Sequence, residues 1–142
     1  MSTQSSKATF ERIVEEIFNN KNLDLIDELV APDLVDHSAP PGLPRGIEGY
    51  RLKLGAFTNA FPDLHLAYEH MIVDGDMVAG RFTLTGTQQG DFGGIPATGK
   101  QISVTGHDFG RVVDGKLTDH WVEMDTLGMM QQLGVIPTPE AV

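Results

Sequence analysis

Two Asp-Gly dipeptides, Asp74-Gly75 and Asp114-Gly115, constrain the fold of this 142-residue chain more than any other feature of its sequence. Asp-Gly suits the central positions of a tight hairpin turn, where both residues adopt positive φ angles. Each dipeptide lies between long stretches in which apolar and polar residues alternate, which is the period of β-strands. We therefore expect two hairpins, built from strands at 64–73, 76–87, 101–113 and 116–124.

The residues that precede Pro62 follow a helical period instead, with apolar side chains three or four positions apart. We expect helices at 9–18, 23–30, 46–61 and 125–133. A Pro-rich loop at 39–44 separates the second helix from the third. Helices grouped ahead of antiparallel hairpins indicate an α+β fold. A strongly curved antiparallel sheet, covered by the N-terminal helices on one face, would form a cone with an internal pocket. We expect one domain over residues 1–142.

The charge balance excludes several classes of function. Ten basic and 20 acidic residues give a net charge of −10, so the chain lacks the basic face that nucleic acid or an anionic membrane surface requires. It contains no cysteine, which excludes thiol catalysis and cysteine metal sites. No apolar run reaches the roughly 20 residues of a membrane span, and the N-terminus lacks the apolar segment of a signal peptide. We expect a cytoplasmic protein.

Three stretches of the sequence carry a family pattern: GRFTLTGTQQGDF at 80–92, GIPATGK at 94–100 and DGKLTDHWVEMDTLGMMQQLG at 114–134. They resemble the SnoaL-like polyketide cyclases, which are small members of the NTF2-like superfamily with its α+β cone fold. The resemblance runs from the first expected helix to Leu133. Because NTF2-like domains host several chemistries, the pattern is more specific for the family than for a reaction.

The resemblance implies a ring closure by an intramolecular aldol reaction of a polyketide ester, with no cofactor and no metal. An acidic residue removes the proton α to one carbonyl, and the carbanion attacks a second carbonyl. The family's acid/base aspartate matches Asp125, with Glu123 as the second candidate. His37 and His107 match histidines of the pocket, where His37 would orient a carbonyl or stabilise an enolate oxygen. His37 could instead be a histidine of a surface loop, and His107 a half-buried strand histidine bonded to the backbone. The implied ligand is a hydrophobic, aromatic carbonyl compound.

Asp125 has a purely structural interpretation as well, because it precedes the last expected helix and could be its N-cap. Counting outward from the Asp114-Gly115 turn pairs Asp108 with Trp121. Strand alternation then gives Asp108, Trp121, Glu123 and Asp125 a common side. Three carboxylates around a tryptophan fit either a polar cavity or a solvated face, since a plain core would not accept them.

The same counting gives His107 and His120 the other side of the sheet, unless a bulge intervenes. It also sets Arg81 opposite Tyr68, where the guanidinium could bind an oxyanion in a cavity or remain on the surface. The histidines form neither a helical i, i+4 pair nor an HExxH motif, so no metal site is expected.

Two other functions stay open at this stage. The first is another NTF2-like enzyme, an isomerase or an epoxide hydrolase, in which Arg81, Asp108 and Asp125 would surround a water molecule. The second is a non-catalytic module that binds a small ligand. Because an open sheet face or edge is usually covered, we expect a homodimer or a higher homo-oligomer.

Overall fold

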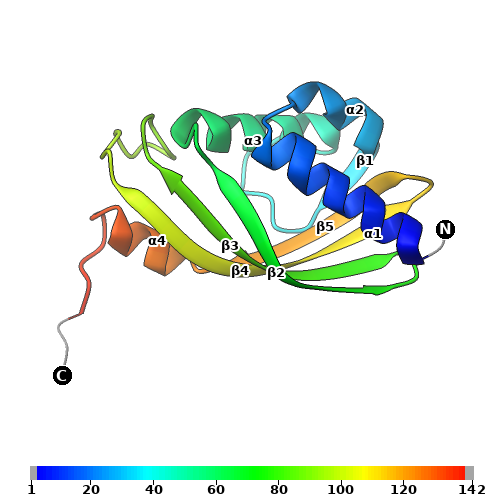
Figure 1. The fold of residues 1–142 in the computed structure, drawn as a ribbon. Helices are drawn as coiled ribbons and strands as arrows, with labels where there is room; N and C mark the ends of the chain where they lie inside the picture. The colour runs from blue at the N-terminus through cyan, green and yellow to red at the C-terminus, as the bar shows by residue number, and fades with distance from the viewer. Residues whose placement is uncertain (1–2, 140–142) are drawn as a thin grey trace.

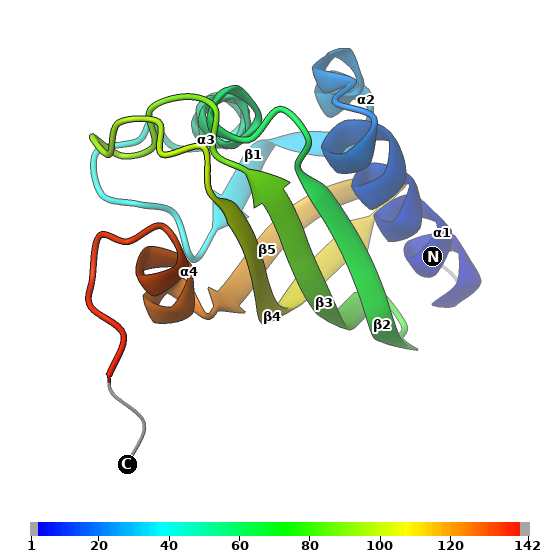
Figure 2. The same cartoon turned by 60° about the vertical axis from the view of Figure 1, so that its left-hand side comes forward.

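The computed structural model describes residues 3–139. Five strands form one curved sheet, and helices α1, α2 and α3 lie on one side of it (Figure 1, Figure 2). The elements in chain order are α1 (Thr3–Arg12), the π-helical η1 (Ile13–Asn19), the 3₁₀ turn η2 (Leu23–Leu25), α2 (Ile26–Leu29), β1 (Val30–Asp36), α3 (Ile47–Ala60), β2 (His65–Asp74), β3 (Met77–Thr87), β4 (Gln101–Val113), β5 (Lys116–Met124) and α4 (Thr126–Gln132). The expected α+β cone is confirmed.

The strand order is β1-β5-β4-β3-β2, and both expected hairpins are present. The expectation of a wholly antiparallel sheet is wrong at one edge, because β1 runs parallel to β5. The second helix ends at Leu29, one residue earlier than expected, and the chain continues directly into β1. Pro32 is compatible with this strand because an edge strand has one side free of ladder hydrogen bonds.

A one-residue bulge at Thr118 controls which side chains of β5 face the helices. Val113 pairs with Lys116 and Val112 with Leu117, but Arg111 pairs with Asp119, so Thr118 has no partner on β4. Beyond this point Asp108 faces Val122 rather than Trp121. The predicted pairing of Asp108 with Trp121 is therefore wrong, because one extra residue exchanges the two faces of a strand.

The register of the first hairpin differs from the expected one at its turn and again at a second bulge, at Glu69 in β2. Asp74 pairs with Met77, so the two-residue loop is Gly75-Asp76, one residue later than the expected Asp74-Gly75. Tyr68 pairs with Phe82, and His70 pairs with Arg81. The predicted position of Arg81 opposite Tyr68 is therefore wrong. Tyr68 and Phe82 share the concave face of the sheet, and Arg81 lies on the convex face.

Glycines on the concave face make room for aromatic rings. A Cβ atom on Gly80 would lie 2.4 Å from the Tyr68 ring, one on Gly106 2.5 Å from the Phe82 ring, and one on Gly110 2.7 Å from the Phe10 ring. These glycines therefore let the three rings lie flat against the sheet. Phe10 meets Tyr68 edge to face, with 5.9 Å between ring centroids.

Gln88 organises the loop between β3 and β4. Its fully buried side chain donates to the carbonyls of Gly90 and Ile95 and accepts from Thr98. Phe92, at the tip of this loop, packs on Phe57 and so ties the loop to α3. None of the helices within residues 3–139 is long and apolar enough to cross a bilayer.

We predict that Gly80→Ala lowers the free energy of unfolding by about 1–3 kcal/mol, because the new methyl group overpacks the Tyr68 ring. The matched control is Gly55→Ala in α3, where a Cβ would meet nothing within 4 Å. That change should raise stability by about 0.5–1 kcal/mol, since alanine favours a helix. Urea unfolding of the three proteins measures both effects. Equal stability of the wild type and Gly80→Ala would contradict the packing described here.

Candidate functional site

A cavity of about 100 Å³ lies between the concave face of the sheet and the helices that cover it. Most of its wall is hydrocarbon and aromatic. Five polar side chains interrupt this wall: Tyr50, Lys53, Tyr68, Asp108 and His120. A mostly apolar hollow with a few convergent polar groups is typical of a small-molecule site.

Asp108 is the centre of the first polar group. Its Oδ2 atom accepts a hydrogen bond of 2.7 Å from the Tyr68 hydroxyl and lies 3.1 Å from His120 Nε2. Asp108 is 4% exposed and His120 is 8% exposed. Within the part of the chain that the structure describes, Asp108 Oδ1 and His120 Nδ1 are buried without a hydrogen-bond partner. Buried polar atoms are seldom left unpaired, so these two atoms are candidates to bind a polar group of a ligand.

Three features of the backbone bring this group together. The bulge at Thr118 turns His120 toward the cavity, and the register of β3 and β4 sets Gly80 beside Asp108. The missing side chain of Gly80 leaves the space that the Tyr68 ring occupies. Burial, and next the negative charge of Asp108, hold the pKa of the Tyr68 hydroxyl far above its ordinary value. Tyr68 is therefore a permanent hydrogen-bond donor to Asp108.

Lys53 and Asp36 form the second polar group. Lys53 Nζ lies 2.8 Å from Asp36 Oδ2, and the two side chains are 13% and 9% exposed. Tyr50 lies one helical turn before Lys53. Burial, followed by the charges of Asp36 and Asp108, holds the pKa of the Tyr50 hydroxyl above its usual range. Sequence reasoning missed Lys53 and Asp36. The only available signal was the position of Lys53 within the apolar stripe of α3.

Comparison with known proteins gives this site its context. The family model described as SnoaL-like polyketide cyclase matches residues 8–133. The chain belongs to this family. It is 34% identical to the aklanonic acid methyl ester cyclase DnrD of Streptomyces peucetius, in a match that covers 99% of this chain and 97% of DnrD.

Solved structures of family relatives share the fold as well. The structure of TsrD from Streptomyces laurentii matches with a TM-score of 0.86 and 32% identity, covering 96% of this chain and 99% of TsrD. IdmH from Streptomyces antibioticus matches with a TM-score of 0.78 and 35% identity, over 92% of this chain and 99% of IdmH. The fold expected of an NTF2-like family member therefore extends over nearly the whole chain.

Asp125, the aspartate matched to the family's acid/base residue, lies outside the cavity wall. It is exposed and caps α4, where its Oδ1 accepts the backbone N–H of Gly128 at 2.9 Å. The N-cap interpretation is confirmed, and the acid/base role of Asp125 stays a prediction. Glu123 is exposed on the convex face, opposite His107. The expected cluster of three carboxylates around Trp121 is not formed, because the bulge at Thr118 separates Asp108 from the others.

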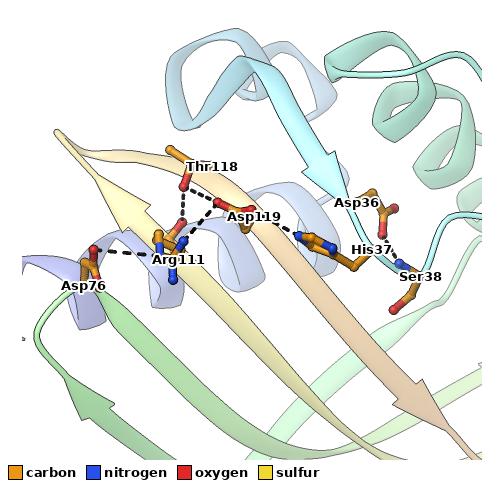
Figure 3. A network of polar contacts seen from close by, with 7 residues as sticks. All are labelled: Asp36, His37, Ser38, Asp76, Arg111, Thr118 and Asp119. Atoms are coloured by element: carbon orange, nitrogen blue, oxygen red, sulfur yellow. Dashed lines mark hydrogen bonds and ion pairs between the residues drawn. The ribbon is translucent and has the colours of Figure 1, made fainter.

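His37 lies on the convex face of the sheet rather than in the cavity. Its ring stacks on Trp121, with 4.2 Å between centroids and 6° between planes, and its Nε2 lies 3.1 Å from Asp119 Oδ2. Figure 3 shows the polar contacts around His37 and Asp119, in which Asp119 also contacts Thr118 and Arg111. Burial acts to raise the pKa of Asp119, but the hydrogen bonds with His37 and Thr118 outweigh it and hold the pKa below its ordinary value.

His107 is exposed on the convex face as the register partner of Arg81. The predicted common side for His107 and His120 is therefore wrong, again because of the bulge in β5. Of the residues singled out from the sequence, Tyr68, Asp108 and His120 meet in the cavity. Among residues 3–139, no three His, Cys, Asp or Glu side chains are grouped so that they could hold a metal ion.

We predict that Asp125→Asn leaves the melting temperature nearly unchanged, because asparagine caps a helix about as well as aspartate. Asp125→Ala should cost about 1 kcal/mol, since the N–H of Gly128 then loses its acceptor. Thermal unfolding of the two variants measures the difference. If Asp125→Ala were as stable as the wild type, the cap would contribute nothing.

Proposed function

We propose that this protein closes a ring in a polyketide ester by an intramolecular aldol reaction, with His120 as the base and Asp108 as its partner. The observation that carries the proposal is the pair of unpartnered buried atoms, His120 Nδ1 and Asp108 Oδ1, in an otherwise apolar cavity. Membership of the cyclase family supports the reaction class.

The hydrogen bonds support a division of roles. An ionised Asp108 only accepts, so its bond with His120 puts the imidazole proton on Nε2 and leaves a lone pair on Nδ1. Nδ1 removes the proton α to one carbonyl of the substrate, and the Asp108 charge stabilises the imidazolium that forms. Tyr68 holds the carboxylate in position through its own hydrogen bond.

The remaining steps balance without another reactant. The electron pair of the broken C–H bond forms the new C–C bond with the second carbonyl carbon, and the π electrons of that carbonyl move to its oxygen. The proton held by His120 then goes to this oxygen. Substrate and product are isomers, so the reaction involves no net oxidation or reduction and needs no redox cofactor.

The size of the cavity bears on how a substrate is accepted. Ligand sites usually enclose about 300–1,000 Å³, whereas this cavity encloses about 100 Å³. A polycyclic substrate therefore has to displace side chains of the covering helices. Phe10, Ile13 and Phe18 from α1 and η1 line the cavity, and π-helical turns such as η1 often occur at functional sites.

Turnover of aklanonic acid methyl ester, on which the relative DnrD acts according to its name, tests the proposal. We expect Asp108→Asn and His120→Gln each to lower kcat at least about 10²-fold, the usual contribution of general acid–base catalysis. Chromatography of substrate and cyclised product measures turnover, and circular dichroism confirms that each variant is folded.

Asp125→Asn and His107→Gln are the matched controls, because they remove the same groups outside the cavity wall. We expect both to keep turnover within about threefold of the wild type. If Asp125→Asn lost activity while Asp108→Asn stayed active, Asp125 and not the His120–Asp108 pair would be the base. Binding of the ester without turnover by the wild type would favour a non-catalytic binding module.

We also propose that a second copy of this chain covers the convex face. Phe109 is 50% exposed at the centre of that face, although phenylalanine is usually buried. Both signs of charge surround it, with Arg81 and Arg111 near Glu123 and Asp119. A face that carries both positive and negative charges suits a two-fold interface, because the same surface of the two subunits is then in contact and opposite charges can pair.

Phe109→Glu should convert such a dimer into a monomer, because it would bury two like charges near the two-fold axis. Light scattering after size-exclusion chromatography measures the mass in solution. Leu52→Glu, at an exposed apolar position on α3, is the control and should leave the mass unchanged. A monomeric wild type at about 100 μM would contradict the proposal.

A further inference from the structure

Lys53 is the one basic side chain with a fixed charge in the cavity wall formed by residues 3–139. Lysines are rarely buried, because an ammonium ion loses its hydration and regains it only in part from a partner. Lys53 nevertheless lies against apolar neighbours with 13% of its side chain exposed. Packing alone therefore does not explain a lysine at this position.

The partner of Lys53 is held by the backbone. Asp36 Oδ1 accepts the N–H of Ser38 at 3.0 Å, and Ser38 Oγ accepts the N–H of Val122 at 2.7 Å. This chain of bonds fixes Asp36 against β5. An ammonium group has three protons to donate, and among the described residues Asp36 is the only acceptor of Lys53. The remaining donor capacity is available to a ligand.

The two polar groups of the cavity lie in one row across the sheet. Asp36 and His120 are register partners on β1 and β5, so their side chains project to the same side from strands about 4.8 Å apart. Tyr50, one helical turn before Lys53, lines the same cavity. A base at one end thus faces two proton donors at the other.

We propose that the Lys53 ammonium, with the Tyr50 hydroxyl beside it, binds the oxygen of the carbonyl that is attacked. This inference rests on the proposed function. As the C–C bond forms, the π electrons of that carbonyl move to oxygen, and Lys53 stabilises the negative charge until His120 returns its proton. With His120 neutral, the charges at the cavity are those of Asp108 and Lys53 in its wall and of Asp36 beside Lys53. Without Lys53, both remaining charges would oppose a developing oxyanion.

An anionic probe and its neutral ester test this oxyanion site without turnover. The probes are anthraquinone-2-carboxylate and its methyl ester, titrated calorimetrically at pH 7. We expect the wild type to prefer the carboxylate. Lys53→Met should weaken carboxylate binding at least about tenfold and leave the ester unaffected, and Lys53→Arg should retain the preference. Lys7→Met, at an exposed position on α1, is the matched control and should change neither affinity.

Asp36→Asn separates an oxyanion site from a structural ion pair. It removes the charge that neutralises Lys53, so it should strengthen carboxylate binding, whereas loss of a purely structural pair would not. Lys53→Met alone leaves the Asp36 carboxylate uncompensated and should lower stability. The double variant Lys53→Met/Asp36→Asn should recover stability but not carboxylate binding.

Two results would overturn the inference: a wild type without preference for the carboxylate, or a Lys53→Met variant that keeps the wild-type ratio of the two affinities. Kinetics with aklanonic acid methyl ester complete the test, since Lys53→Met should lower kcat more than it raises KM and Lys53→Arg should restore part of kcat. A wild type that cyclises nothing would refute the proposed reaction. The binding titrations would still decide the role of Lys53.

Discussion

The buried carboxylate of Asp108 is the group on which the arrangement of the cavity depends. A charge among hydrocarbon side chains is tolerated only where hydrogen bonds replace its hydration. Asp108 Oδ2 receives two of them, from Tyr68 on β2 and from His120 on β5. The first requires a glycine at position 80 of β3, and the second requires the bulge at Thr118. Each of the strands β2 to β5 therefore contributes one residue to the surroundings of this carboxylate. A substitution at any of these residues would alter the hydrogen bonds of Asp108.

Local signals in the sequence were sufficient for most of the fold. The Asp114-Gly115 turn and the alternating pattern predicted the bounds of β4 and β5 as the structure has them, and Pro62 correctly separated helix from strand. Each of these signals is contained within a few residues. β1 was missed because its signal is not local: Pro32 disfavours a strand, and the pairing partner β5 lies more than 80 residues further along the chain.

The candidate site was only partly predictable from the sequence. Strand alternation predicts which face each residue occupies, and one unforeseen bulge reverses that prediction for the rest of the strand. Tyr68, Asp108 and His120 were candidates, but counting from the turn gave Asp108 and His120 opposite faces. No residue near Thr118 in the sequence predicts the bulge. Thr118 instead makes hydrogen bonds to the Arg111 carbonyl and to Asp119, which only the folded ladder creates. The pairing of Lys53 with Asp36 likewise depends on how α3 lies over β1.

The two faces of β5 carry two His–Asp pairs, and their surroundings rather than their residue types decide which pair is the better candidate for acid–base catalysis. His37 and Asp119 on the convex face form the same pair of groups as His120 and Asp108, at the same distance of 3.1 Å. Outside, Asp119 has His37, Thr118 and Arg111 around it, and its lowered pKa makes it a poor base. Water and salt also screen an exposed pair. Inside, the same two groups keep one unpartnered atom each, and hydrocarbon surrounds them. A proton transfer at His120 is therefore coupled to the charge of Asp108 far more strongly than any transfer at His37 is to Asp119.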